Sequence, residues 1–151
     1  MNVRYRTASI TDASVMAPMN AQLIRDEGHR NAMTVLQLAE RMTDWLKAEY
    51  QACLFELESK AIGYALYRFE PEYVYLRQLF VRPEMRRRGI ARSALEWLRQ
   101  NAWAVRPRVR IDVLVGNRSG IEFWRSVGFT DYCLTMERPV ASTRRRTTAG
   151  A

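Results

Sequence analysis

The sequence predicts a mixed α/β fold, with one largely antiparallel sheet of six to seven strands and four helices on its faces. Strand-like runs at residues 51–58, 61–69 and 73–81 are separated only by short turns, so we expect them to pair antiparallel. The runs at residues 73–81 and 108–115 enclose a helical pattern, so these two strands should form a parallel pair. One sheet therefore combines both kinds of pairing.

One strand and two helices are predicted for the N-terminal third. Alternating side chains predict a strand over residues 3–8. Thr11 or Asp12 can cap a helix that runs to about residue 24. After a polar loop, Thr34 and Gln37 match a capping box, so a second helix should begin there and end near residue 50.

The centre of the chain is a strand, a basic turn and an amphipathic helix. Aromatic and branched residues fill residues 73–81, and from Gly89 to about Trp103 the apolar residues recur at helical spacing. A glycine lets backbone N–H groups approach a ligand, and the first N–H groups of a helix lack internal partners, so this junction should attract anions. Five arginines add positive charge there: Arg82, Arg86, Arg87, Arg88 and Arg92.

The last third alternates between strands and turns. A strand over residues 108–115 should lead through a turn into a short helix over residues 119–127, closed by Gly128. Residues 129–140 should supply one or two final strands. Residues 141–151 have no apolar face and are predicted to form a disordered basic tail behind a single domain of residues 1–140.

Composition limits the class of protein. The 151 residues carry a formal net charge of +8, which favours an anionic cofactor, a nucleic acid or a membrane surface as partner. No run is long enough for a membrane helix, and the N-terminus lacks the apolar core of a secretion signal, so we expect a cytoplasmic protein. Cys53 and Cys133 should be reduced and buried, and one histidine makes a metal site improbable.

Two blocks of the sequence resemble the GNAT N-acetyltransferase superfamily. The basic turn fits the (Gln/Arg)-x-x-Gly-x-(Gly/Ala) signature, directly after a Leu-aromatic-Val-x-Pro strand end at residues 79–83. Asn117, the Phe123-Trp124 pair and Gly128-Phe129 resemble the closing motif of the same superfamily. The resemblance covers about residues 1–140 and implies a GNAT fold, with its parallel central strands splayed around coenzyme A (CoA).

The resemblance implies acetyl-CoA as co-substrate and assigns the residues that hold it. Backbone N–H groups of the basic turn would bind the pyrophosphate at the positive end of the following helix. The strand end would pair with the pantetheine arm and stabilise an oxyanion on the thioester carbonyl. Asn117 is either a contact to the arm or only a turn residue. The implied cofactor-binding residues are Leu79, Phe80, Val81, Arg86, Arg87, Arg88, Gly89, Ile90, Ala91, Arg92, Asn117 and Trp124.

The sequence identifies the catalytic residues less clearly than the cofactor-binding residues. Many GNAT enzymes have a tyrosine acid where this chain has Trp124, whose indole N–H has no useful acidity. Tyr132 is the nearest replacement in sequence. Candidate bases are Glu27 and His29 in the loop between the first two helices, and Glu70 or Glu72 before the central strand. Deprotonation through water, without a dedicated base, is an alternative. The loop of residues 25–33 should shape the acceptor site, and its Asp26 and Glu27 would favour a cationic amine.

The sequence therefore predicts an acetyl-CoA-dependent N-acetyltransferase that works by direct attack of an acceptor amine, without an acyl-enzyme. The acceptor is a small molecule or a peptide amine that the sequence does not name, and the resemblance makes a homodimer plausible. One alternative is a non-catalytic acyl-CoA-binding sensor, since Trp124 replaces the usual acid. Another is nucleic-acid binding, which lacks any recognised motif outside the basic tail, so we expect no specific nucleic-acid partner and no membrane partner.

Overall fold

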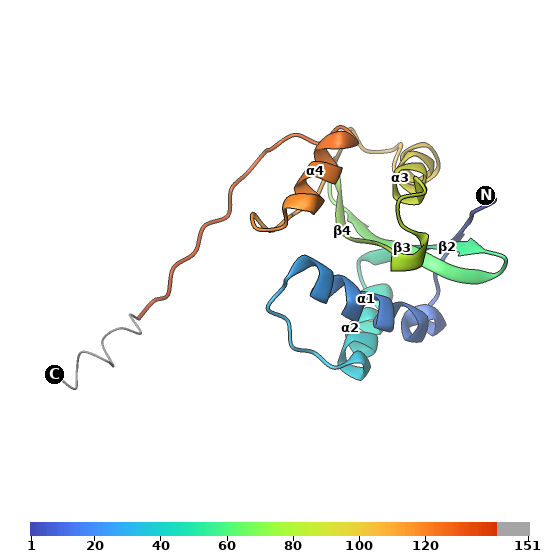
Figure 1. Cartoon of the computed structure of the whole chain (residues 1–151), viewed down its shortest axis with the longest axis horizontal. Helices are drawn as coiled ribbons and strands as arrows, with labels where there is room; N and C mark the ends of the chain where they lie inside the picture. Colours follow the sequence, from blue (N-terminus) through green and yellow to red (C-terminus); the bar gives the residue numbers. More distant parts are fainter. Residues whose placement is uncertain (142–151) are drawn as a thin grey trace.

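A single sheet of five strands organises the described part of the chain (Figure 1). The structure is a computed structural model, and it describes residues 1–141. Residues 142–151, which make up nearly all of the predicted basic tail, lie outside the described residues. The strands are β1 (Arg4–Thr7), β2 (Tyr50–Leu57), β3 (Lys60–Phe69), β4 (Tyr73–Val81) and β5 (Arg108–Arg110), in that spatial order.

The pairing of the strands follows the lengths of their connections. β2 pairs antiparallel with β3, and β3 with β4, because tight turns join them. β1 also pairs antiparallel with β2, although a long connection that contains two α-helices joins these two strands. β4 and β5 pair in parallel, and the connection between them contains a helix. The predicted mixture of antiparallel and parallel strands is therefore confirmed.

Four α-helices cover the two faces of this sheet: α1 (Ala13–Glu27), α2 (Val35–Lys47), α3 (Ile90–Asn101) and α4 (Arg118–Ser126). In Figure 1, α1 and α2 lie below the sheet, and α3 and α4 lie above it. Short 3-10 turns, Ile10–Asp12 and Pro83–Met85, lead toward α1 and α3. The predicted capping box of α2 is present, since Gln37 N–H donates to Thr34 Oγ1 over 3.2 Å and Thr34 N–H donates to Gln37 Oε1 over 2.9 Å.

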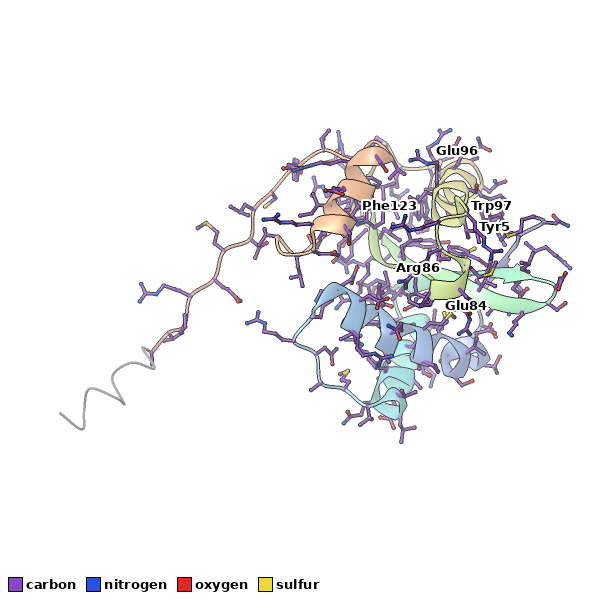
Figure 2. The ribbon with its side chains drawn as sticks, viewed as in Figure 1. Tyr5, Glu84, Arg86, Glu96, Trp97 and Phe123 are labelled. Carbon is purple, nitrogen blue, oxygen red and sulfur yellow. The ribbon has the colours of Figure 1, made fainter. Side chains whose placement is uncertain are left out.

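Each face of the sheet has its own apolar core. The α1 and α2 side buries Met16, Met42 and Phe80, among others, and the α3 side buries Phe55, Ala94 and Leu98, among others. On the α3 side, Trp97 stacks on Tyr5 of β1 with ring centroids 4.7 Å apart, and both are labelled in Figure 2. These two cores hold β4 in the middle of the molecule, with a helix pair on each side.

The predicted count of six to seven strands is wrong for the described residues, which form five. Residues 129–140, predicted as one or two strands, form none, and residues 131–140 are all exposed. The strand predicted over residues 108–115 is paired only over Arg108–Arg110. An alternating sequence is not a strand by itself, because a strand needs the backbone groups of a neighbour, and these residues leave the sheet instead.

Both cysteines are free, as predicted, but only one is buried. Burial raises the pKa of the Cys53 thiol to about 12, so this thiol is inert near neutral pH. Cys133 is exposed, contrary to the prediction, because it lies in the segment that leaves the sheet. No helix within residues 1–141 combines the length and apolar character needed to cross a membrane.

Candidate functional site

A cleft opens where β4 and β5 separate. The two strands pair only from Tyr73 to Tyr75, so the rest of β4, through Val81, has no strand on this side. A bulge in β4 adds to the divergence: Tyr67 of β3 pairs with Leu76 and Leu66 pairs with Gln78, which leaves Arg77 as the extra residue. The backbone groups at the end of β4 are therefore available to a ligand that lies along the strand.

The entrance of α3 closes one end of this cleft. Gly89 caps the helix in the left-handed conformation, with φ of 76°, and Arg87 before it also has positive φ, 62°. The first backbone hydrogen bond of α3 runs from Ser93 N–H to the Gly89 carbonyl over 3.0 Å. The N–H groups of residues 89–92 precede that bond and donate to no group of the described chain. Free donors of this kind at the start of a helix are suited to an anion, which stays a prediction for this chain.

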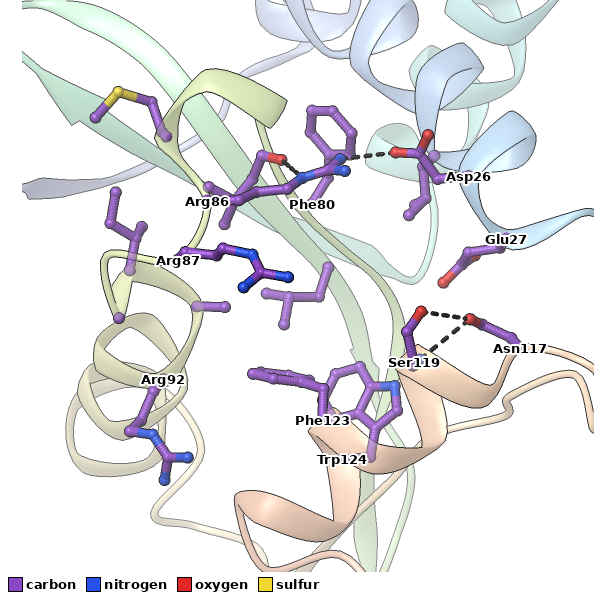
Figure 3. Close-up of a pocket in the computed structure, with 18 residues that line it drawn as sticks. Asp26, Glu27, Phe80, Arg86, Arg87, Arg92, Asn117, Ser119, Phe123 and Trp124 are labelled. Atoms are coloured by element: carbon purple, nitrogen blue, oxygen red, sulfur yellow. Dashed lines mark hydrogen bonds and ion pairs between the residues drawn. The ribbon is translucent and has the colours of Figure 1, made fainter.

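The cleft is a largely apolar cavity with polar groups at its ends. It encloses about 470 Å³, a size suited to a small molecule or cofactor arm. α1, the end of β4, the turn before α3 and the start of α4 supply its walls (Figure 3). Its lining residues include Leu23, Leu79, Val81, Met85, Ile90 and Phe123.

The structure shows which of the five arginines near the start of α3 are held by hydrogen bonds and which face the cavity, a distinction that the sequence could not make. Arg82 Nε donates to the Ala61 carbonyl over 2.7 Å, and Arg92 donates to the Ser126 carbonyl and hydroxyl over 3.3 Å each. Only Arg87 extends its guanidinium into the cavity, where Figure 3 shows it between α3 and the wall formed by α4. No ion pair or hydrogen bond within residues 1–141 occupies it.

Arg86 has a structural position. Its Nε donates to the Val81 carbonyl over 2.8 Å, and its Nη2 lies 2.7 Å from Asp26 Oδ2 of α1. The guanidinium also lies over the Phe80 ring, 5.3 Å from the centroid. Arg86 therefore ties the end of α1 to the end of β4 across the cleft, which leaves its side chain little freedom to bind a phosphate.

The opposite wall is the first turn of α4. Asn117 caps this helix, because its Oδ1 accepts the Gly120 N–H over 3.1 Å. The side chain of Asn117 therefore has a capping role and also lines the cavity. Trp124 packs edge-on against Phe123 and Phe129, with ring centroids 5.1 and 5.2 Å away, and presents its ring to the cavity.

Two acidic residues at the end of α1 face the cleft. Asp26 is neutralised by Arg86, which offsets its burial and lowers the pKa of its carboxyl. Glu27 has no arginine or lysine partner within the described residues, and its Oε1 lies 3.0 Å from His29 Nε2. Burial raises the pKa of Glu27, while the neighbouring imidazole opposes that shift. The pKa of Glu27 is therefore raised, whereas that of Asp26 is lowered, which makes Glu27 the more basic carboxylate of the cavity.

Comparison with known families agrees with this geometry. A family model described as the acetyltransferase (GNAT) family matches residues 21–129. The chain belongs to the GNAT acetyltransferase family. A comparison with curated proteins gives no match.

Solved structures share the GNAT fold at low sequence identity. A possible acetyltransferase from Clostridium difficile 630 is 14% identical, with a TM-score of 0.78 over 94% of this chain and 99% of that chain. The aminoglycoside N-acetyltransferase AAC(6′)-Iy in complex with CoA is 17% identical, with a TM-score of 0.72 over 93% and 96%. A predicted acetyltransferase with acetyl-CoA from Clostridium acetobutylicum is 19% identical, with a TM-score of 0.71 over 92% and 97%.

The GNAT cleft brings together most, but not all, of the predicted site residues. All the predicted cofactor-binding residues line it except Arg88, which is exposed. Glu27 lines it as well. Tyr132 does not: its hydroxyl accepts from Arg110 Nη2 over 3.3 Å, in the exposed segment beyond α4. Glu72 is exposed at the turn before β4, also outside the cavity.

Some lining residues of the GNAT cleft were missed by the sequence analysis. Leu23, Met85 and Ser119 carry no local signal of function. An apolar residue in a helical segment is ordinarily interpreted as part of the core, and a serine after a helix cap as part of a turn. Ser119 lies two residues after Asn117, on the first turn of α4, and only the fold of that turn brings it to the cavity.

Proposed function

We propose that this GNAT protein transfers the acetyl group of acetyl-CoA to an amine acceptor. The observation that carries the proposal is the cleft between the separated ends of β4 and β5, which has an anion site at one end and Glu27 at the other. The family membership supports the donor, and two of the similar solved structures are complexes with CoA or acetyl-CoA. Nothing in the comparisons favours the alternative of a non-catalytic acyl-CoA sensor.

The residues present fit CoA as the donor substrate. The free N–H groups at the start of α3 suit the pyrophosphate, because they are oriented donors at the positive end of a helix. The Arg87 side chain suits a further phosphate. The apolar walls suit the pantetheine arm, which can pair with the open edge of β4 near Leu79 as an added strand does.

The proposed chemistry is a single direct transfer. Glu27 in its ionised form accepts a proton from the ammonium of the acceptor and leaves a free amine. The amine nitrogen bonds to the thioester carbonyl carbon, and a backbone N–H at the end of β4 stabilises the oxyanion that forms. The carbon–sulfur bond then breaks, the electron pair leaves on sulfur, and the nitrogen loses its second proton to water or to the departing thiolate. Buried Cys53 takes no part, because burial keeps its thiol protonated.

The departing sulfur does not need a tyrosine acid. The cavity lining contains no tyrosine among the described residues, and Trp124 stands where many GNAT enzymes have one. A thiol with a pKa near 8.5 leaves as thiolate near neutral pH, so protonation can follow departure. Tyr132 lies outside the cavity, so we assign it no role in the transfer.

A screen of amines with acetyl-CoA tests the proposed function. The panel should contain amino acids, polyamines, aminoglycosides and peptides, and free thiol release should be followed against a control without amine. We expect at least one amine to raise thiol release well above that control. If CoA binds and no amine is acetylated, the protein is not an N-acetyltransferase of these acceptors. The alternative function, a non-catalytic acyl-CoA-binding sensor, then replaces the proposal.

Replacing Arg87 with alanine should weaken acetyl-CoA binding. We expect KM for acetyl-CoA to rise about tenfold with little change in kcat, because the guanidinium contacts a phosphate remote from the reacting carbonyl. Arg88→Ala is the matched control: it removes the same charge from the neighbouring residue, whose side chain does not line the cavity. Equal KM values for the two variants would show that Arg87 acts only through the general positive field.

We also propose that the chain forms a homodimer. Support comes from the exposed segment after α4, where Tyr132, Leu134 and Met136 are 77%, 66% and 82% accessible, an unusual exposure for large apolar side chains. The edge of β5 next to this segment is unpaired within residues 1–141. Light scattering should give the mass of two chains, and a chain ending at residue 129 should give the mass of one.

A further inference from the structure

Two arginines share one aromatic ring on the α2 side of the sheet. The guanidinium carbon of Arg41, on α2, lies 4.2 Å from the centroid of the Trp45 ring, and that of Arg77, on β4, lies 4.6 Å from it. Tyr50 of β2 adds a second ring beside Arg77, whose Nη1 lies 3.4 Å from the tyrosine hydroxyl. Aromatic faces can stabilise a guanidinium, but they do not neutralise its charge.

Neither arginine has a carboxylate partner among the described residues. Asn20 Oδ1, 3.3 Å from Arg41 Nη2, is the only hydrogen-bond acceptor of Arg41 within residues 1–141. Arg41 Nε is buried without an acceptor, and so is the amide nitrogen of Asn20 beside it. Burial lowers the pKa of Arg41, and repulsion from Arg77 lowers it further. A buried N–H without an acceptor costs free energy, so the surroundings of Arg41 leave part of its hydrogen-bonding capacity unmet.

The surrounding charges leave the surface basic. Arg68 pairs with Glu70 over 2.9 Å, and Asp112 accepts the Tyr75 hydroxyl over 2.8 Å. Arg110 stacks on Tyr73, with 4.1 Å between its guanidinium carbon and the ring centroid. Four arginines (41, 68, 77 and 110) and two carboxylates (70 and 112) therefore meet here, which leaves a net charge of +2.

The arginine pair lies close to the proposed reacting centre. Arg77 is the bulge residue of β4, two positions before Leu79, and two residues of a strand span roughly 7 Å. Gln78 between them is buried and accepts the Tyr64 hydroxyl over 2.7 Å. Both Arg41 and Glu27 lie near enough to Tyr64 to alter its pKa, which burial raises. Arg41 also donates a hydrogen bond to Asn20, which lies seven residues, about two turns, before Glu27 on α1, so Arg41 and Glu27 lie on the same side of that helix.

We infer that the acceptor is an amine that also carries a carboxylate, as amino acids do, and that Arg41 and Arg77 bind this carboxylate while the amine faces Glu27. The inference rests on the proposed acetyl transfer and names its acceptor class. A bound carboxylate offsets the net positive charge and accepts hydrogen bonds from two guanidinium groups that have no carboxylate partner among the described residues. An acceptor with both groups also accounts for the presence of a base, Glu27, on one side and of the unpaired guanidinium groups of Arg41 and Arg77 on the other.

Kinetics with matched acceptors form the first test. Thiol release is measured with the common amino acids and with their carboxamides, which keep the amine and lose the negative charge. We expect at least one amino acid to have kcat/KM ten- to a hundredfold above that of its amide. Arg77→Met should remove most of this preference by raising KM for the acid alone. Arg4→Met, an exposed arginine of β1 outside this cluster, is the matched control and should keep it.

Binding without turnover separates failure of this inference from failure of acetyl transfer. Calorimetry with the CoA-saturated protein compares N-acetylated amino acids with the matching N-acetyl amides. At least one acid should bind about tenfold or more tightly than its amide, and both Arg41→Met and Arg77→Met should reduce that ratio toward one. Melting temperatures verify that the variants fold. Equal binding of every acid and amide, or a preference unchanged in both variants, would overturn the carboxylate site, whatever the amine screen shows.

Discussion

Replacing Glu27 with glutamine should lower kcat for acetyl transfer by about a hundredfold, with a smaller change in KM for acetyl-CoA. Glutamine keeps the size of the side chain and can keep the contact to His29. It cannot accept the proton of an ammonium, so only the small fraction of acceptor that is already a free amine can react. Glu27 lies outside the end of the cleft that should hold the phosphates, which is why donor binding should survive.

The pH dependence gives this prediction a signature that a structural role would not produce. Burial raises the pKa of Glu27, so its base form should be lost at a higher pH than for an ordinary glutamate as the solution is acidified. The wild-type rate should therefore fall as pH drops through that raised pKa. The Glu27→Gln variant should lack this part of the profile and show only the ionisation of the acceptor amine.

Stability should change in the opposite direction to activity. A carboxyl whose pKa is higher in the folded than in the unfolded protein contributes its full stabilisation below the unfolded pKa, and this contribution is lost as pH rises through the folded pKa. Near neutral pH the ionised Glu27 therefore costs stability, and the glutamine variant should melt at the same or a higher temperature. Glu40→Gln, an exposed carboxylate of α2, is the matched control and should leave both properties unchanged. A Glu27→Gln enzyme with wild-type kcat would place the base elsewhere, with water as the remaining route.

The parts of the site that depend on local sequence could be predicted. The bounds of β4, the capping box of Thr34 and the glycine at the entrance of α3 each follow from a signal a few residues long. The free N–H groups at the entrance of α3 could be predicted for the same reason, because a strand, a glycine and a helix start lie next to one another in the chain. The family signature covers this same stretch, so it identified the donor and left the acceptor open.

The parts that depend on contacts between distant residues could not be predicted. Arg86 and Arg87 are neighbours in a run of three arginines, and only the approach of Asp26 from α1 makes the first structural and leaves the second facing the cavity. Arg77 reads as an ordinary exposed residue of a strand, and its role depends on a bulge that the pairing with β3 creates. The alternation of residues 129–140 predicted a strand, but pairing requires an edge that alternation does not supply.

Gly63 is another residue whose importance appears only in three dimensions, and Gly63→Ala should be the most destabilising single substitution of a small residue in the sheet. Gly63 pairs with Phe55 of β2 on one side and Val81 of β4 on the other. A methyl group added there would overlap the Phe80 carbonyl oxygen and lie 2.9 Å from Phe55 Cδ2. We expect a loss of about 3 kcal/mol or more in the free energy of unfolding, measured by urea denaturation.

The size of the effect follows from what would have to move. Phe55 and Phe80 are both buried, one in each core, so neither ring can turn away into solvent. Relief requires a shift of the β4 backbone, and that strand supplies the groups proposed to hold the pantetheine arm. Gly63→Ala should therefore also raise KM for acetyl-CoA in whatever fraction stays folded. Gly116→Ala adds the same methyl where nothing lies within 4 Å, and it should change the unfolding free energy by less than about 0.5 kcal/mol. Similar unfolding free energies for the two variants would mean that the β4 backbone can shift at Phe80 to accommodate the methyl group. A strand that shifts there could not be the rigid support on which the proposed oxyanion contact depends.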